Sequence, residues 1–117
     1  MIDCRVDDLE SAAEFWSKAL GRPLADADPT NPDYRKLGAP PGGMTLVLQK
    51  VEHESRIHLD IETDDVEAEV ARLEQLGAIR LRFVEHWWVM QAPSGHVFCV
   101  TNRHRPLADK PDASTWP

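Results

Sequence analysis

The chain has 117 residues, which is enough for one domain with a real core but not for two independent domains. Thirteen basic residues against twenty acidic ones give a net charge of -7, which argues against nucleic acid as a partner because phosphate backbones favour basic surfaces. The sequence lacks a run of about 18 apolar residues and the pattern of a signal peptide, so we expect a soluble, cytoplasmic protein with no membrane partner.

A strand and an amphipathic helix are predicted at the start of the chain. Residues 2–6 alternate apolar and polar side chains, which is the period of a half-buried strand. Apolar residues then recur at helical spacing, with Asp7 or Asp8 placed to cap the first turn and Gly21 to end the last. Two aromatic residues of this helix are expected in the core: Phe15 and Trp16.

Two further strands are predicted in the first half. The segment 22–43 is rich in Pro, Asp and Gly, which marks turns, and a short strand is expected inside it at 34–37. Residues 44–51 form a firmer strand, with Leu48 on one face and Gln49 on the other.

The second half is predicted to repeat this order. Residues 57–63 alternate as one continuous strand, and a helix follows between a capping Asp65 and a terminating Gly77. Three polar side chains share one face of the strand: His58, Asp60 and Glu62.

A hairpin and a last strand complete the second half. Residues 79–84 and 85–91 are predicted to pair, and a Pro-Ser-Gly turn leads into a strand over 96–101. Trp87 and Trp88 are adjacent on a strand, so they point to opposite faces. One of them is expected in the core and the other at a pocket or the surface, and the sequence leaves open which is which.

Residues 103–117 are predicted to form an irregular tail, because they hold three prolines and mixed charges. Trp116 is the exception in this tail, and we expect it to pack on its own domain or on a neighbouring subunit. The two cysteines, Cys4 and Cys99, lie in apolar strand-like runs, where free thiols pack as small hydrophobic groups. No disulfide is expected between them.

An internal repeat relates the two halves. Residues 2–10 align with residues 59–67 when Asp8 is set over Asp65, and both copies then run through a helical stretch to Leu-Gly. A repeat of about half the chain predicts two similar supersecondary units, neither of which buries its apolar face alone.

Short segments of both halves carry a recognisable pattern: Ile2-Asp3-Cys4, Ala13-Glu14-Phe15-Trp16, Leu20-Gly21, Leu48-Gln49-Lys50-Val51, Ile57-His58-Leu59-Asp60 and Gly95-His96-Val97-Phe98-Cys99-Val100. In these segments the chain resembles the vicinal oxygen chelate superfamily of glyoxalase I, extradiol dioxygenases and bleomycin-resistance proteins, and most of all its glyoxalase-like branch. The resemblance implies an α+β fold of two tandem βαβββ modules that form a cupped mixed sheet. It implies a single domain over residues 1–102, with modules at about 1–51 and 56–102, and a homodimer.

Metal-using members of this superfamily take one ligand from the first strand and one from the last strand of each module. In the second module these positions fall on His58, which matches the usual histidine, and on Cys99, where a glutamate is usual. In the first module they fall on Met1, which is no such ligand, and on Val47, or on Gln49 if the register shifts by two.

The ligand set implied by the resemblance is therefore incomplete. Glyoxalase-type chemistry needs a metal that polarises carbonyl oxygens and a carboxylate that moves a proton, and extradiol oxygenases hold iron with two histidines and one carboxylate. One His, one Cys and one Gln form neither set. The cofactor is therefore left unassigned. The alternative is a divalent metal at His58, and one form of this alternative is zinc bound by His58, Cys99 and other ligands.

The resemblance also turns the polar strand face into the lining of a ligand pocket, which is predicted to comprise Asp3, Gln49, His58, Asp60, Trp87, Trp88 and Cys99. Asp3 lies opposite Asp60 in the repeat, so the two would form a paired-carboxylate site that supplies a general acid. Ion pairing of Asp3 with Arg5, or solvation, is the more ordinary outcome. An aromatic wall beside acidic groups suits a planar or cationic organic ligand.

Three functions follow from these residues. The leading one is a pocket protein that binds a small organic molecule without the full family metal site, in the manner of bleomycin-resistance proteins. The alternative is a metal-dependent lyase, isomerase or dioxygenase with a divalent metal at His58. The third is an interaction module whose exposed sheet pairs with a partner protein.

Overall fold

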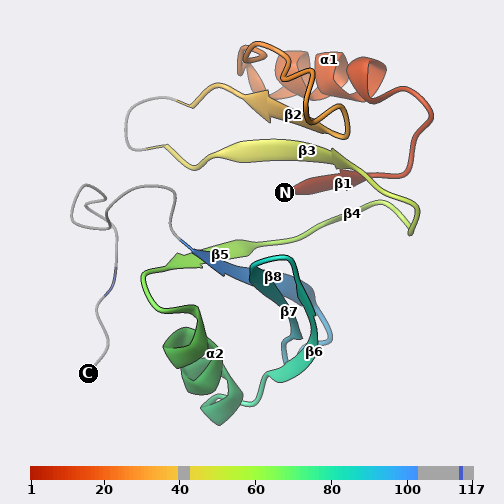
Figure 1. Ribbon diagram of the computed structural model, residues 1–117. Coiled ribbons are helices and arrows are strands. Elements are labelled where there is room, and N and C mark those ends of the chain that lie inside the picture. The colour runs from red at the N-terminus through yellow and green to blue at the C-terminus, as the bar shows by residue number, and fades with distance from the viewer. Residues whose placement is uncertain (40–42, 103–113, 115–117) are drawn as a thin grey trace. The chain divides into compact units, whose positions relative to one another are not determined.

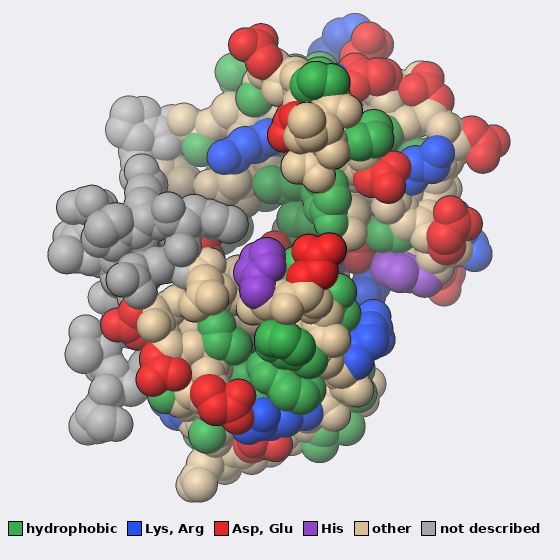
Figure 2. All heavy atoms as spheres, viewed as in Figure 1, with side chains coloured by type: hydrophobic (Ala, Val, Ile, Leu, Met, Phe, Trp, Pro, Cys, Tyr) green, Lys and Arg blue, Asp and Glu red, His purple; other side chains and the backbone are tan. Residues whose placement is uncertain are grey.

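The computed structural model describes residues 1–39, 43–102 and 114 (Figure 1). Trp116 and, apart from residue 114, the predicted tail lie outside these residues. The chain divides into two compact units, Met1–Ile57 and the part that begins at His58. Among the described residues, no helix has the length and apolar character needed to span a bilayer. Acidic side chains are spread over the visible surface of both units (Figure 2).

The first unit is one helix on a four-stranded sheet. Its elements are β1 (Ile2–Cys4), α1 (Leu9–Leu20), β2 (Tyr34–Leu37), β3 (Leu46–Lys50) and β4 (Arg56–Ile57). The strand order is β2-β3-β1-β4, and β1 runs parallel to β3 and antiparallel to β4. The Asp8 carboxylate caps α1 by accepting a hydrogen bond from the backbone N–H of Glu10 at 3.0 Å, and Gly21 ends the helix with a φ of 65°.

The core of the first unit forms between α1 and the sheet, where Leu9 and Ala13 pack with the buried strand residues Leu37 and Leu48. Trp16 packs against this core, but Phe15 is 61% exposed, so its predicted burial was wrong. The reason is helical geometry. Leu9, Ala13 and Trp16 share one face, and Phe15 lies two residues from Ala13, which turns it toward the opposite face.

The second unit repeats the arrangement with longer strands. Its elements are β5 (Asp60–Thr63), α2 (Val66–Gln75), β6 (Ile79–Val84), β7 (Trp87–Gln91) and β8 (Val97–Asn102). The strand order is β5-β8-β7-β6, with β5 parallel to β8. Asp65 caps α2 by accepting a hydrogen bond from Ala68 N–H at 3.0 Å, and Gly77 follows the helix with a positive φ of 107°.

The two sheets have matching topology, since β1-β3-β2 corresponds to β5-β8-β7. The first-unit counterpart of β6 is reduced to one isolated bridge, in which Leu24 pairs with Leu37 of β2. The predicted α+β class with two tandem modules is confirmed, and the first module carries a shortened second strand.

The predicted continuous strand over 57–63 is interrupted at His58 and Leu59. Ile57 pairs with Ile2 in the first sheet, whereas Asp60 pairs with Cys99 in the second. Because the two ends of the segment are hydrogen-bonded in different sheets, one uninterrupted alternation is not formed. Leu59, predicted to share one strand face with Ile57 and Ile61, is 62% exposed.

Candidate functional site

The sheet of the second unit has two distinct faces. One packs on α2 through Met90, Phe98 and Val100, which form a cluster with Val70 of the helix. Paired residues of neighbouring strands share a face, and alternate residues along a strand point to opposite faces. The other face therefore carries Asp60 of β5, its partner Cys99 of β8 and the partner of Cys99 on β7, Val89.

His58, Asp60 and Cys99 converge on this second face. The Nε2 atom of His58 lies 3.2 Å from Oδ1 of Asp60, and one ligand atom from each of the three residues lies within 4.8 Å of the other two. The side chain of His58 is 7% exposed, that of Asp60 is 37% exposed, and Cys99 is partly buried. We call these three residues the donor cluster. It is the one such group of His, Cys, Asp and Glu in the described part of the chain.

Strand alternation separates the two tryptophans that the sequence could not distinguish. Trp88 pairs with Val100 and packs against the core on the α2 side, where its ring lies 5.3 Å from that of Phe83 and 4.9 Å from the guanidinium carbon of Arg80. Trp87 therefore points to the face of the donor cluster. Trp88, which was among the predicted pocket residues, belongs to the core.

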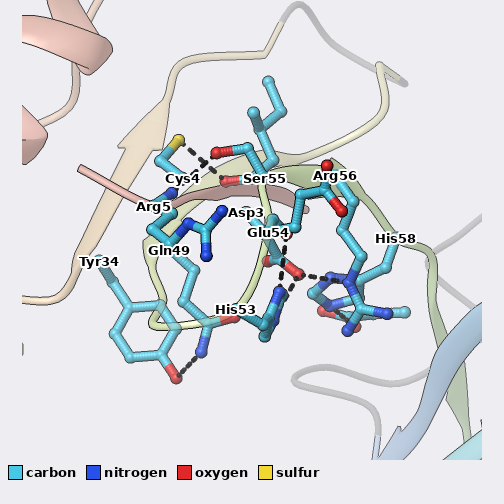
Figure 3. Close-up of polar contacts among 12 residues, drawn as sticks. Asp3, Cys4, Arg5, Tyr34, Gln49, His53, Glu54, Ser55, Arg56 and His58 are labelled. Carbon is cyan, nitrogen blue, oxygen red and sulfur yellow. Dashed lines mark hydrogen bonds and ion pairs between the residues drawn. The ribbon is translucent and has the colours of Figure 1, made fainter.

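The other two predicted pocket residues, Asp3 and Gln49, belong to the first unit. Asp3 pairs with Gln49 of β3 and with Arg56 of β4, and Gln49 pairs in turn with Tyr34 of β2. These four side chains form a polar row across the first sheet (Figure 3). The amide of Gln49 donates a hydrogen bond to the Tyr34 hydroxyl at 3.0 Å.

Asp3 is held by an ion pair that sequence reasoning missed. Its side chain is 1% exposed, and Arg56 Nε lies 3.2 Å from its Oδ2 atom, with His53 Nε2 at 3.7 Å from the same oxygen. Arg5, the partner considered from the sequence, is exposed and donates its backbone N–H to the Ser55 hydroxyl. Arg56 takes the role because the antiparallel register places it directly opposite Asp3. No local pattern marks a two-residue strand such as β4.

Burial of Cys4, next to Asp3, raises the pKa of its thiol, and the negative charge of Asp3 raises it further. The Cys4 sulfur donates a weak hydrogen bond to the Ile2 carbonyl at 3.5 Å. A buried thiol that stays protonated is a packing group rather than a nucleophile or a metal ligand.

The donor cluster offers one nitrogen, one oxygen and one sulfur atom. Zinc accepts all three, at bond lengths of about 2.0–2.3 Å, and in catalytic sites it commonly takes three protein ligands and leaves one position open. Calcium and magnesium prefer oxygen ligands throughout. The residues present therefore fit a zinc-type ion.

A family model described as a glyoxalase-like domain matches residues 1–101 of the chain. No curated protein matches the chain. A glyoxalase/bleomycin resistance protein/dioxygenase superfamily member from Vibrio splendidus 12B01 has a similar structure, with a TM-score of 0.53 at 14% identity over 87% of this chain and 94% of that chain. This likeness shows the fold.

Two further solved structures match over similar lengths. One is TnmS3, an antibiotic binding protein from Streptomyces sp. CB03234, with 24% identity, 86% of this chain and 90% of that chain covered, and a TM-score of 0.34. The other is the trypanothione-dependent glyoxalase I from Leishmania major, with 20% identity, 86% and 82% covered, and a TM-score of 0.38.

Proposed function

Since this chain belongs to the glyoxalase-like domain family, we propose that it binds a small organic molecule on the face of the second sheet that carries the donor cluster. The observation that supports the proposal is the convergence of His58, Asp60 and Cys99 on the face opposite α2, which is also the face of Trp87. Binding sites for small molecules combine apolar and aromatic lining with a few convergent polar groups, which is the composition of this face.

The chemistry of the face favours a planar ligand with a polar or cationic group. Trp87 offers an aromatic surface for stacking or for cation–π contact. The Asp60 carboxylate and the His58 imidazole, 3.2 Å apart, provide an acceptor and a second polar group for one end of such a ligand. Val89, which is buried and pairs with Cys99, adds an apolar side chain to this face.

A thermal-shift screen of planar aromatic compounds, half of them cationic, tests this proposal on the full chain. We expect at least one cationic compound to raise the melting temperature by an amount that grows with the logarithm of its concentration above the Kd. The substitution Trp87→Ala should weaken binding by about tenfold or more, the loss expected for an aromatic stacking contact. Phe15→Ala removes an exposed aromatic side chain of the first unit, is the matched control and should bind as the parent does. A screen without hits, or equal binding by the Trp87 variant, contradicts the proposal.

A second candidate function is a metal-dependent lyase, isomerase or dioxygenase, and the donor cluster is the observation that favours it. In this role His58, Asp60 and Cys99 would hold the metal, which would polarise a carbonyl oxygen when bound. Elemental analysis of protein purified without chelator tests it. Stoichiometric metal together with turnover of an oxo compound supports an enzyme, and a metal-free protein that still binds its organic ligand supports the first proposal.

We also propose that the chain forms a homodimer. The strand β6 lies at the end of its sheet and exposes three large apolar side chains, Ile79, Leu81 and Phe83. Large exposed apolar side chains on an edge strand are typical of a protein–protein contact. Light scattering coupled to size exclusion gives the mass in solution, and a monomer at all concentrations contradicts the proposal.

A further inference from the structure

We propose that His58, Asp60 and Cys99 form a zinc site built entirely within the second unit, with Asp60 as its third protein ligand. The inference deepens the proposed function, because the ion would lie on the face that binds the organic ligand. It does not depend on that ligand, since its test measures the metal alone.

The backbone ladder brings two of the three ligands together. Asp60 and Cys99 are direct partners in the parallel pairing of β5 with β8, so their side chains leave the sheet side by side on the same face. The N–H of Cys99 also donates a hydrogen bond to the Leu59 carbonyl at 2.9 Å, which ties β8 to the chain between His58 and Asp60. The positions of the carboxylate and the thiol are therefore set before any ion binds.

The distances among the donor atoms suit one small ion. Ligand atoms around a tetrahedral zinc are about 3.4–3.6 Å apart, given bonds of about 2.0–2.3 Å. His58 Nε2 and Asp60 Oδ1 are already 3.2 Å apart, and each pair that includes the sulfur lies within 4.8 Å. The widest pair needs to close by no more than about 1.4 Å, which is within the reach of a side-chain rotation.

The donor types narrow the metal to zinc or a close analogue. A thiolate and an imidazole together select borderline and soft transition metals over magnesium and calcium. Three protein ligands leave one tetrahedral position for water or for an oxygen of the organic ligand. The Asp60 side chain is 37% exposed while the His58 side chain is 7% exposed, so water or a ligand would reach the ion from the side of Asp60.

The competing explanation is an ordinary pair of His58 and Asp60 beside a neutral thiol. In that case the cluster is a hydrogen-bonded group on a sheet face, and added metal binds weakly or at scattered histidines. Cobalt(II) separates the two explanations, because a cobalt–thiolate bond gives a charge-transfer absorption band that a histidine-only site does not give. Cys99 and Cys4 are the two cysteines of the chain, so a cobalt–thiolate band must come from one of these two residues.

The experiment titrates the full chain, stripped with a chelator, with cobalt(II) and then with zinc. We expect a thiolate band that saturates at one cobalt per chain and disappears when one equivalent of zinc displaces the cobalt. Cys99→Ser should remove the band. Asp60→Asn and His58→Gln should each weaken zinc binding by more than the roughly 10–100-fold that loss of an outer-shell partner causes.

Three control variants test whether the metal binds at His58, Asp60 and Cys99 rather than elsewhere on the chain. Cys4→Ala removes the other cysteine, which lies in the core of the first unit, and should leave the band unchanged. His86→Gln and Asp26→Asn remove exposed groups of the same kinds and should leave zinc affinity unchanged. If Cys99→Ser fails to fold, protection of Cys99 from alkylation by zinc in the parent protein, read by mass spectrometry, replaces it.

The inference is overturned by a parent protein without the band, by a band that persists in Cys99→Ser, or by unchanged zinc affinity in Asp60→Asn. It is also overturned if zinc gives Cys99 no protection. Organic ligand binding is measured in the metal-free protein, so loss of that binding with an intact cobalt band refutes the proposed function and leaves the zinc site standing. Intact binding of the organic ligand without a cobalt band refutes the zinc site and leaves the proposed function standing.

Discussion

Arg56 holds the buried carboxylate of Asp3, at 3.2 Å between Nε and Oδ2, across the short antiparallel pairing of β4 with β1. The carboxylate is almost completely removed from solvent, whereas the guanidinium remains about one third exposed. The two partners therefore contribute unequally to stability. Loss of the arginine leaves a buried charge, and loss of the aspartate leaves a cation that water can still solvate.

This asymmetry predicts the outcome of a double-mutant cycle. Arg56→Met should lower the free energy of unfolding by about 2–3 kcal/mol, a value reduced for the partial exposure of the arginine. Asp3→Asn should cost less, and the double variant should recover part of the loss from Arg56→Met. Urea denaturation of the four proteins measures the cycle, and additive single effects would show that the pair contributes nothing.

The cap of α1 predicts a dependence of stability on pH. The hydrogen bond from the Ser11 hydroxyl, supported by the backbone N–H of Glu10, lowers the pKa of Asp8 below its ordinary value of 3.8. Because the pKa is lower in the folded state, the contribution of Asp8 is complete above pH 3.8 and is lost as the pH falls through the folded value. Asp8→Ala should destabilise the protein at neutral pH, and the difference from the parent should shrink in strong acid. The adjacent Asp7→Ala is the control and should follow the parent at every pH.

The two tryptophans should respond differently to substitution. Trp88 packs in the core, so Trp88→Ala should cost on the order of 3 kcal/mol of unfolding free energy, near the lower end for large-to-small core changes. Trp87→Ala should cost clearly less but should remove binding of the organic ligand. Guanidinium denaturation and the thermal-shift screen, run on both variants, measure the two effects. Equal destabilisation would mean that both rings contribute to the core.

The two thiols should differ in reactivity. Burial, and then the charge of Asp3, raise the pKa of Cys4, so little thiolate is present near neutral pH, whereas Cys99 is only partly buried. Iodoacetamide should therefore label Cys99 well before Cys4 in the metal-free protein, as followed by peptide mass spectrometry. Asp3→Asn should accelerate labelling of Cys4 only modestly, because burial is the larger cause of the shift. Labelling of both thiols at one rate would contradict the burial of Cys4.

A charge on the outer strand should separate the proposed dimer. Leu81 is exposed on β6, and Leu81→Glu places a carboxylate in the apolar surface that we propose as the contact. The variant should elute with the monomer mass in light scattering while its melting temperature, measured at low concentration, stays close to that of the parent. Glu85→Gln, an exposed change at the hairpin turn, should leave the mass unchanged.

Local signals predicted much of this fold. The limits of α1 follow from Asp8 and Gly21, whose roles depend on a few neighbouring residues, and the shared face of Asp60 and Glu62 on β5 follows from simple alternation. The interruption at Leu59 could not be predicted, because it depends on which sheet each end of the segment joins. The pairing of Asp60 with Cys99 and of Asp3 with Arg56 likewise depends on register between segments far apart in the sequence.

The interruption after β4 has a consequence for the donor cluster itself. Asp60 and Cys99 belong to the hydrogen-bonded ladder, so their separation is as stiff as the sheet. His58 precedes that ladder by two residues and follows β4 directly, so the backbone torsions of the connection set the reach of its imidazole. Two donors are therefore fixed by the sheet and the third by the connection, so backbone changes in the connection, rather than in the sheet, should alter the affinity of the proposed site.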